Sequence, residues 1–581
     1  MDRLFPIDTI ETTCQDCYKC LRQCPVKAIR IEGGHAKITP ELCVACGACV
    51  QVCPVQAKKI RLDLGRARHL VDQEEQVFVS LAPSWMGEYP GLKPEQMVVA
   101  LKSLGFSGVS ETALGAQEVS AVVAGMLNTN GLHISSACPA TVRLIKKYLP
   151  EHVNDITAVH SPVMAHCKLL REHFGEGTRV VFIGPCIAKK TEADEHRELL
   201  EIALSFEELN DWFAQMKIDP YQMEPGEEDH FVPSSAEEGS LYPVEGGMVT
   251  TIQAQCSCDS ARYVTVSGIE NIFKTLEGVD SSSLQHPVFI EALGCEGGCI
   301  GGPCAQAPGA LLGKRVLVED QTIMPPLPLV RKHRLDISRS FTPDPPQPPA
   351  PDPALVREAL RRIGKRLPED ELNCSGCGYN TCREFATALV RGTAEETMCV
   401  SHMRALAQKK ANALLRSMPS GVVIVDANMR IVECNERFAR MFGTETAEIY
   451  ETCPGLKGCS LAKVIDFTEM FRTALKFDQE IHYDHFRYQS RLLNITVFSL
   501  DPHQTVGAVI LDVTRQEGLR DQIAQQAQEV IRRNLSTVQE IAARLGEHMA
   551  DTEILLRSIA EGYAVENKRL QSAPPPEEEK R

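Results

Sequence analysis

Cysteines at short, regular spacings are the residues of this chain that could do chemistry. Two strings with the same pattern, C-x2-C-x2-C-x3-C-P, begin 29 residues apart at Cys14 and Cys43. Thiolates are soft donors that suit iron and zinc, and this tight spacing lets successive thiolates of one loop face a single metal cluster. The two strings therefore predict metal centres near the N-terminus. Their cysteines are Cys14, Cys17, Cys20, Cys24, Cys43, Cys46, Cys49 and Cys53.

This doubled string resembles the run of bacterial two-[4Fe–4S] ferredoxins, in which the fourth cysteine of each string binds the other cluster. A zinc site is the alternative, but zinc cysteines usually come as C-x2-C pairs separated by a longer span. The resemblance implies two electron-transfer clusters, one on Cys14, Cys17, Cys20 and Cys53, and one on Cys43, Cys46, Cys49 and Cys24.

Three further cysteine motifs lie far apart: SSACP at 135–139, GPCIAKKTE at 184–192 and GCEGGCIGG at 294–302. With the residues around them, 77–310, they resemble the catalytic domain of [FeFe] hydrogenases. The resemblance implies that four cysteines hold a [4Fe–4S] cluster. It also implies that Cys299 bridges this cluster to a two-iron subcluster that carries CO, cyanide and a dithiolate amine. The implied ligands are Cys138, Cys186, Cys295 and Cys299.

The same resemblance assigns residues around the two-iron subcluster. Lys189 falls on the family lysine that donates to a cyanide ligand, where a cation offsets the negative charge of the cluster. Glu192 falls on the family glutamate that follows this lysine. Cys299 and Lys189 are therefore the expected catalytic residues. The residues expected to line the two-iron site are Ala82, Pro83, Ser84, Ala137, Ser161, Pro162 and Glu192.

Ala137 is the departure from the family with the largest consequence. The fast enzymes have a cysteine there that passes protons. Proton transfer needs a titratable group within hydrogen-bond reach, which alanine lacks. The acidic pair expected further along the proton path aligns with Val122 and Val123. Smaller departures are Val163, Gly184, Leu293 and Cys304.

This combination is similar to the sensory-type (group C-like) [FeFe] hydrogenases, in which turnover is slow. The resemblance predicts slow, reversible H2 oxidation and proton reduction by an H2 sensor. One alternative is an iron–sulfur redox-sensing scaffold without H2 chemistry, which never receives the two-iron subcluster. Another is a working ferredoxin-dependent hydrogenase with a different proton path.

A further iron–sulfur unit is predicted at 354–405, where four cysteines follow the spacing C-x2-C-x4-C-x16-C. The pattern resembles the small single-[4Fe–4S] domain appended to corrinoid proteins and electron-transfer subunits. Three ligands would share one loop, and a helix over 383–398 would return the fourth; zinc is the alternative metal. The unit would relay electrons. Its cysteines are Cys374, Cys377, Cys382 and Cys399.

Residues 406–515 resemble a PAS domain, with paired strand-like runs before an N-x2-F helix start and later strands at 493–499 and 505–513. PAS domains bind haem, flavin or nothing, so the ligand stays open. Seven cysteines of the chain have no assigned role, and buried structural thiols are the default interpretation. The seven are Cys167, Cys256, Cys258, Cys304, Cys434, Cys453 and Cys459. For Cys434, Cys453 and Cys459 the alternative is a redox switch or a further cluster site. For Cys256, Cys258 and Cys304 the alternative is an extra cluster ligand.

The segment 516–570 is predicted to be a signalling helix. Apolar residues at alternating steps of four and three form a heptad seam that contains one polar position, Asn534. The seam favours a homodimeric coiled coil, and a helix docked on its own domain is the alternative. Because the helical segment carries no kinase or phosphatase signature, output would pass to a partner such as a signalling kinase or phosphatase. The seam positions are Ala527, Ile531, Asn534, Val538, Ile541 and Leu545.

These motifs require several scaffolds, and 581 residues give room for about four domains. Strand-like runs such as 77–82 and 180–183 alternate with helical stretches and predict a two-lobed α/β domain. The expected fold is multidomain α/β and α+β. The expected divisions are 1–65 ferredoxin-like module, 70–335 hydrogenase-like domain, 336–353 Pro-rich linker, 354–405 small helical [4Fe–4S] domain, 406–515 PAS domain, 516–570 coiled coil and 571–581 disordered tail.

Composition narrows the cellular setting. The 23 cysteines cluster at metal-site spacings and indicate a reducing cytoplasm. A net charge of −16 without a long basic run makes nucleic acid an improbable partner, and no apolar run reaches membrane-span length. The expected partners are H2, protons, ferredoxin or another electron carrier, and the maturases that install the two-iron subcluster. The expected cofactors are four [4Fe–4S] clusters and that subcluster.

Overall fold

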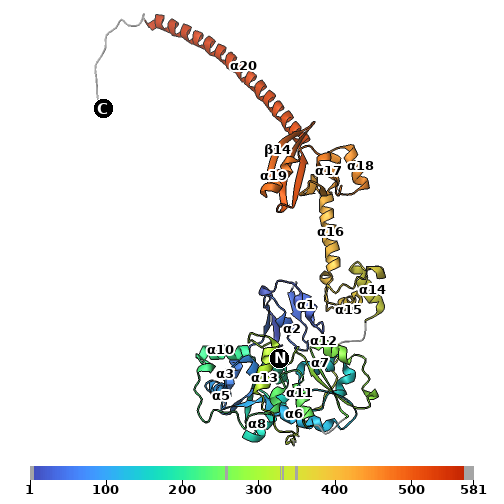
Figure 1. Ribbon diagram of the computed structural model, residues 1–581. Coiled ribbons are helices and arrows are strands. Elements are labelled where there is room, and N and C mark those ends of the chain that lie inside the picture. The colour runs from blue at the N-terminus through green and yellow to red at the C-terminus, as the bar shows by residue number, and fades with distance from the viewer. Residues whose placement is uncertain are drawn as a thin grey trace, which may run out of the picture. The chain divides into compact units, whose positions relative to one another are not determined.

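The computed structural model describes residues 5–33, 35–255, 260–327, 329, 331, 333–346 and 351–567. Its internal contacts divide the chain into two units, Met1–Met403 and Arg404–Arg581 (Figure 1). Within the described residues, no helix is both long enough and apolar enough to cross a membrane.

The N-terminal module is built from two similar halves. In each half a cysteine string leads into a short helix, and antiparallel strand pairs close the module. Apolar side chains such as Leu21, Ile29 and Leu42 fill the space between the strings and exclude water from it. The elements are β1 Ile7–Thr9, α1 Lys19–Gln23, β2 Ile29–Glu32, β3 His35–Ile38, α2 Ala48–Gln51 and β4 Lys58–Ile60.

Two parallel sheets follow, one in each lobe of an α/β domain, as the sequence predicts. The first has the strand order β6-β5-β8-β9 and the second β10-β11-β7. Strand β5 is buried at every position, which is typical of parallel strands covered on both faces. The strands are β5 Val77–Leu81, β6 Gly108–Glu111, β7 Gly131–Ile134, β8 Arg179–Ile183, β9 Ile202–Leu204, β10 Arg262–Ser267 and β11 Pro287–Leu293.

Helices cover these sheets. Helices α3, α5 and α10 lie beside the first lobe, and α7 and α12 lie beside the second (Figure 1). The helices are α3 Leu64–Gln73, α4 Trp85–Glu88, α5 Pro94–Lys102, α6 Thr112–Met126, α7 Pro139–Tyr148, α8 Pro162–Phe174, α9 Ala188–Glu195, α10 Phe206–Met216, α11 Gly247–Gln253, α12 Ile269–Leu276 and α13 Leu311–Gln321.

The Pro-rich segment begins packed on this domain rather than as a free spacer. Ile337 is buried, and the Asp344 N–H donates to the Lys146 carbonyl at 2.8 Å. Helices α14 Pro353–Arg362 and α15 Cys382–Val390 then form the small cysteine unit. The predicted helix over 383–398 is wrong in its second half. Helix α15 ends at Val390 because Gly392 adopts a left-handed φ of 69°, and a short 3-10 turn returns Cys399.

The second unit holds an antiparallel sheet in the order β13-β12-β16-β15-β14. The predicted strands 493–499 and 505–513 correspond to β15 and β16, the latter one residue shorter. The elements are α16 Val400–Ser417, β12 Gly421–Asp426, β13 Ile431–Cys434, α17 Glu436–Met441, α18 Thr444–Thr452, α19 Glu469–Phe477, β14 Ile481–Tyr488, β15 Arg491–Asp501 and β16 Thr505–Asp512.

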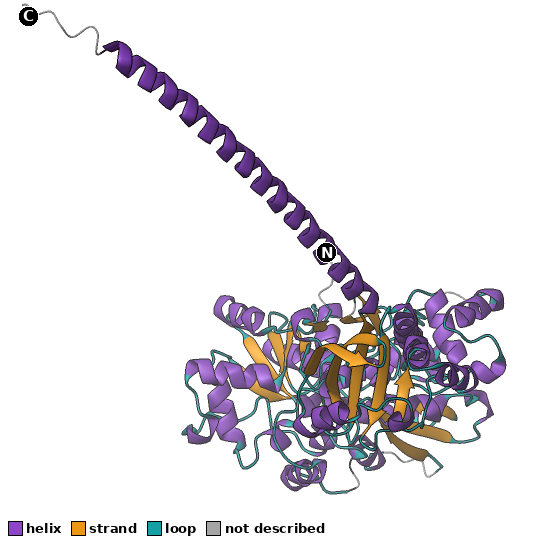
Figure 2. Ribbon diagram, turned by 90° about the horizontal axis from the view of Figure 1, so that it is seen from above, coloured by secondary structure: helices purple, strands orange, loops and turns teal. Residues whose placement is uncertain are grey.

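One long helix, α20 Thr514–Asn567, follows this sheet (Figure 2). The apolar seam residues Ile531, Val538, Ile541 and Leu545 are each more than half exposed on the single chain. The helix is thus present as expected, and its pairing with a second copy stays a prediction. The expected tail, 571–581, lies outside the described residues.

Candidate active site and metal centres

The predicted site residues follow the carboxyl ends of four parallel strands. Segments beginning at Ala82, Ser135, Gly184 and Gly294 come directly after β5, β7, β8 and β11. Carboxyl ends of parallel strands open onto a shared crevice, so the two lobes bring these distant motifs together. They enclose a cavity of about 90 Å³. Its lining includes Ala82, Pro83, Ser84, Ala137, Cys138, Pro162, Cys186, Lys189 and Cys299.

The four cysteines implied to be cluster ligands lie next to one another. The Gly294 N–H donates to Cys138 Sγ at 3.4 Å. Burial, with the neighbouring Cys138 thiolate, raises the pKa of Cys186 to about 11. Burial followed by the thiolates of Cys186, Cys299 and Cys138 raises the pKa of Cys295 well above its usual value. Clustered thiols of this kind are costly to ionise together unless a cation shares them, which suits a metal centre.

Lys189 is held at the cavity wall by two side chains. Its Nζ donates to Glu192 Oε2 at 2.6 Å and to Ser161 Oγ at 3.0 Å, and Ser161 donates to Glu192 Oε1 at 2.7 Å. Burial alone would raise the pKa of Glu192, but the Lys189 ammonium and these hydrogen bonds hold it below the usual value. The Glu192 carboxylate thus lies directly against the Lys189 amine in a largely apolar site.

Ala137 faces an apolar wall rather than a chain of proton carriers. It packs against a cluster that contains Val119, Val123 and Met248. The α6 residues that line the cavity are Thr112, Ala113 and Ala116. Val122 and Val123 also belong to α6 and carry no carboxyl group.

Two other family departures have structural explanations. At Gly184 a methyl group would approach Phe182 Cζ to 2.6 Å and Ala82 Cβ to 2.7 Å. The Phe182 ring thus takes the space that the family methionine would need. Leu293 ends β11 and lines the cavity, where it replaces a thioether with another apolar side chain.

The residues present fit a buried polar cofactor. Ser84 Oγ is buried and lacks a hydrogen-bond partner among the described residues, although Ser84 lines the cavity. A buried hydroxyl without a partner is costly, so a ligand acceptor in the cavity would relieve it. Soft thiolates on one side and the Lys189 cation on the other match an iron group with anionic ligands.

In the N-terminal module, the last cysteine of the first string lies with the first three cysteines of the second. Cys24, Cys43, Cys46 and Cys49 line one small cavity. The pKa of Cys20 is raised by burial and, against the opposing charge of Lys58, by the thiolates of Cys53 and Cys14. Cys20 therefore lies near these two cysteines. Cys17, the fourth member of that set, is exposed.

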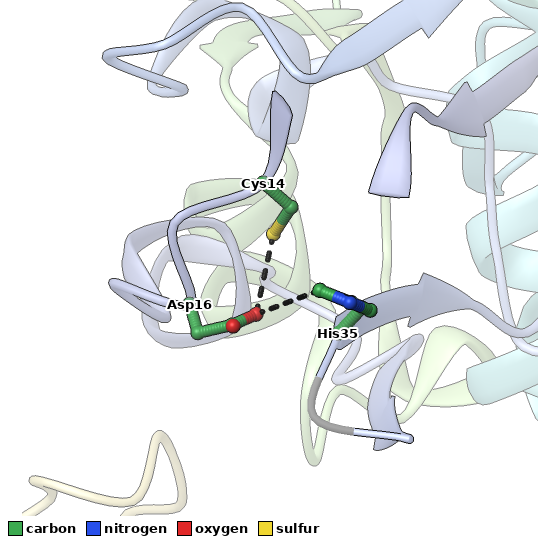
Figure 3. Close-up of side chains that lie close together, drawn as sticks. All are labelled: Cys14, Asp16 and His35. Atoms are coloured by element: carbon green, nitrogen blue, oxygen red, sulfur yellow. Dashed lines mark hydrogen bonds and ion pairs between the residues drawn. The ribbon is translucent and has the colours of Figure 1, made fainter. Parts of the chain in front are cut away.

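Sequence reasoning missed two polar residues beside the first string. His35 Nδ1 and Cys14 Sγ lie 3.2 Å and 3.5 Å from the same Asp16 carboxylate oxygen (Figure 3). The three candidate ligand atoms all lie within 4.8 Å of one another. Because His35 sits on a separate strand, β3, only the spatial contact reveals it. Its place beside one predicted ligand puts a titratable ring next to that cluster site.

The ferredoxin-like module packs closely against the α/β domain at Gly47. A methyl group at Gly47 would approach Pro303 Cγ to 2.5 Å and Ile187 Cδ1 to 2.8 Å. The Gln51 side chain also donates to the Gly301 carbonyl at 3.1 Å. This close approach places Cys46 near enough to Cys295 to contribute to its raised pKa, after burial and the three nearer cysteines.

The small unit has its own cysteine cavity, lined by Cys374, Cys377, Cys382 and Cys399. It also contacts the ferredoxin-like module. A methyl group at Gly378 would clash with Leu21 Cδ2. Tyr379 and Phe385 join Leu21 in one apolar core. The small unit therefore packs on the ferredoxin-like module, which in turn packs on the α/β domain.

The unassigned cysteines of this unit divide into two groups. Cys304 and Cys167 are fully buried, and burial raises the pKa of each thiol above its usual range. Neither lines the cavity. Cys256 and Cys258 lie outside the described residues.

Family comparisons identify four modules. Residues 75–303 match the iron only hydrogenase large subunit, C-terminal domain, and residues 7–54 match a 4Fe-4S dicluster domain. An Fe–S cluster family matches residues 370–401, and a PAS domain family matches residues 410–474. The prediction of a hydrogenase-like domain with iron–sulfur and PAS modules is confirmed at this level.

The chain is similar to two curated hydrogenases. It is 23% identical over 287 residues to iron hydrogenase 1 of Clostridium pasteurianum, covering 39% of this chain and 50% of that protein. It is 23% identical over 380 residues to the NADP-reducing hydrogenase subunit HndD of Solidesulfovibrio fructosivorans, covering 54% and 60%. The chain thus spans roughly half the length of each relative.

Solved structures give related matches. A variant of the [FeFe]-hydrogenase HydA1 from Chlamydomonas reinhardtii aligns with a TM-score of 0.37 and 16% identity, covering 47% of this chain and 91% of that one. A domain of an HTR-like protein from Haloarcula marismortui aligns with a TM-score of 0.14 and 21% identity, covering 17% and 100%.

Proposed function

We propose that this protein is an H2-responsive sensor, in which a hydrogenase-like domain at 70–335 holds an H-cluster with slow turnover. The observation that carries the proposal is the cavity between the lobes. It combines the thiol of Cys299 and the fixed cation of Lys189 with an apolar wall at Ala137. Metal-binding residues are retained there, and a titratable side chain at position 137 is not.

In this proposal the cavity residues have three separate roles: binding the cluster, orienting its ligands and excluding water. Cys138, Cys186, Cys295 and Cys299 would hold the cubane, with Cys299 shared with the two-iron group. When bound, that group would supply an open iron at which H2 is split heterolytically. Lys189, held in place by Glu192, would orient the anionic ligands of the group. The apolar wall around Ala137 excludes water and moves no proton, which limits turnover.

Electrons would pass along the packed series of iron–sulfur sites. Gly47 packs the ferredoxin-like module against the α/β domain, and Gly378 packs the 354–405 unit against that module. The redox state would then be read by the PAS domain at 406–515. It would be passed along the helix 516–570, as a homodimer, to a signalling partner.

A redox-sensing scaffold without H2 chemistry is the second candidate, and the missing proton carrier at Ala137 favours it. Infrared spectroscopy separates the two. Protein expressed anaerobically and matured with the two-iron complex should show CO and cyanide bands that shift between argon and H2. The Cys299→Ala variant should lose these bands, and Cys167→Ala, which removes a buried thiol outside the cavity, should keep them. Absence of bands in the matured wild type would leave the scaffold.

A further inference from the structure

Three cysteines that the proposed function does not use lie in the PAS-like domain. Cys434 ends strand β13 and is buried in the core of this domain. Cys453 and Cys459 bracket the loop that follows helix α18, and both are partly exposed. The loop, CPGLKGC, has cysteines at both ends.

Backbone hydrogen bonds fold this loop against β13. The Ile431 N–H donates to the Cys459 carbonyl at 2.8 Å, and the Gly458 N–H donates to the Ile431 carbonyl at 2.7 Å. The first part of the loop, just after Cys453, lies at the end of β13. A methyl group at Gly455 would lie 4.0 Å from the Cys434 nitrogen. Cys459 therefore lies beside Ile431, and the limb after Cys453 lies beside Cys434.

An irregularity in β13 turns Cys434 toward the loop side. The register with β12 shifts between Ile424 and Val425. As a result Ile431 and Cys434 are both buried, although they stand three positions apart and a regular strand would turn them to opposite faces. Cys434 belongs to the apolar core of this domain, and Cys459 packs against the same core. Cys453 stands two residues before Gly455, which lies against Cys434, so the three cysteines are gathered around one end of β13.

The loop backbone resembles the cluster loops of the N-terminal module. Gly455 has a φ of +84°, two residues after Cys453. Ala45 and Asp16 have φ values of 58° and 50° at the same distance from Cys43 and Cys14. A left-handed residue at this place turns backbone N–H groups inward, the arrangement found around anions and iron–sulfur sites.

The spacing of the thiols selects the occupant. Cys434 stands three positions along β13 from Ile431, where Cys459 pairs. That is roughly 10 Å at the usual rise, and a disulfide needs Cα atoms within about 7 Å. Zinc bonds of about 2.3 Å would place all its thiolate sulfurs within 4.8 Å of one another. Among the described residues, the trio with that spacing is Cys14, Asp16 and His35. A cubane cluster holds its thiolates farther apart.

We propose that Cys434, Cys453 and Cys459 bind a [4Fe–4S] cluster in the PAS-like domain. Three thiolates would hold three irons, and the fourth iron would take a non-thiolate ligand. The site is partly exposed through Cys453 and Cys459, so a small molecule in solution can reach that iron. The cluster would give the domain its own redox-active group.

Iron and sulfide counts on the full-length chain test the proposal. Wild type, Cys453→Ser, Cys459→Ser and the control Cys167→Ala are reconstituted anaerobically with iron and sulfide. The two loop variants should each hold about four fewer iron and four fewer sulfide ions per chain than wild type. Cys167→Ala should lose none. Electron paramagnetic resonance of the reduced proteins should show one cluster signal missing in the loop variants.

Equal iron and sulfide in all four proteins would overturn the proposal. So would loop-variant losses of zinc instead of iron, or a Cys434–Cys459 disulfide found in non-reduced peptides. Cys453 and Cys459 are partly exposed, so their serine variants should keep the domain folded. Circular dichroism and thermal unfolding check this before the counts are compared. A loss seen only in unfolded variants also contradicts the proposal.

Discussion

Removing the carboxylate beside Lys189 is the most direct test of the electrostatics of the cavity. The side chains of Lys189 and Glu192 are 10% and 5% exposed and lie 2.6 Å apart. In Glu192→Gln the amide oxygen still accepts from Ser161, but the buried ammonium loses its counter-charge. Breaking a buried ion pair from one side costs about 3–5 kcal/mol. We expect the lower end of this range because the amide remains a hydrogen-bond acceptor.

Glu195→Gln is the matched control. Glu195 ends the same helix, α9, and pairs with Arg143 at 2.5 Å, but its side chain is 40% exposed. Exposed pairs contribute less than about 1 kcal/mol. Both tryptophans, Trp85 and Trp212, are buried in the first lobe, so their fluorescence reports the unfolding of this domain.

The expected result is a clear separation of the two variants. A loss of about 3 kcal/mol lowers the midpoint of thermal unfolding by roughly 10 °C in a domain of this size, and Glu195→Gln should shift it by less than about a third of that. Because the pKa of Glu192 is lowered, its stabilisation is present above the usual value and lost as pH falls below about 4.5. The variant should lack this acid loss. Equal midpoints for Glu192→Gln and Glu195→Gln would refute the reasoning.

Three other predictions concern other parts of the first unit. Burial raises the pKa of Glu111 to about 7, so stability falls as pH rises from about 4.5 to about 7. In urea unfolding, Glu111→Gln should remove this pH dependence and raise the free energy of unfolding by about 3 kcal/mol near pH 8. An unchanged pH dependence would contradict this. Gly47→Ala should slow electron transfer from reduced ferredoxin to the cavity cluster by about tenfold or more. The control Gly33→Ala should leave the rate unchanged, because Gly33 also has a positive φ but no neighbour within 4 Å. Equal rates in the two variants would show that the contact at Gly47 is irrelevant. Ala137→Cys alone should raise H2 turnover by less than about tenfold, because its neighbours are apolar; a gain of about 10²-fold or more would show that another carrier completes the path.

The sequence predicts most of the local structure of the metal sites. Short cysteine spacings keep ligands within one loop, and strand-like runs predict β5 and β8 because apolar parallel strands have a simple signature. The helix over 383–398 is wrong in its second half because one left-handed glycine, Gly392, ends it. Helix propensity does not reveal such a stop when the residues on both sides favour a helix.

Contacts between modules cannot be predicted from spacing. Gly47 against Pro303 and Gly378 against Leu21 join segments more than 250 residues apart in sequence. Nothing local distinguishes these glycines from Gly33, which has open space around it. The same holds for His35 beside Cys14, since its own strand gives no sign of a metal neighbour. Tertiary packing decides which glycine or histidine matters.

The architecture explains how metal binding and proton transfer can separate in one domain. The cysteines follow the ends of β7, β8 and β11, and close glycine contacts fix these loops. The wall beside Ala137 comes instead from helix α6, whose residues Val119 and Val123 also pack the second lobe. Substitutions on α6 can therefore replace carboxylates by valines and improve packing without moving a ligand. The proposed H2 response requires binding at the loops but no rapid turnover, so under that proposal such an exchange on the helix would cost the protein little.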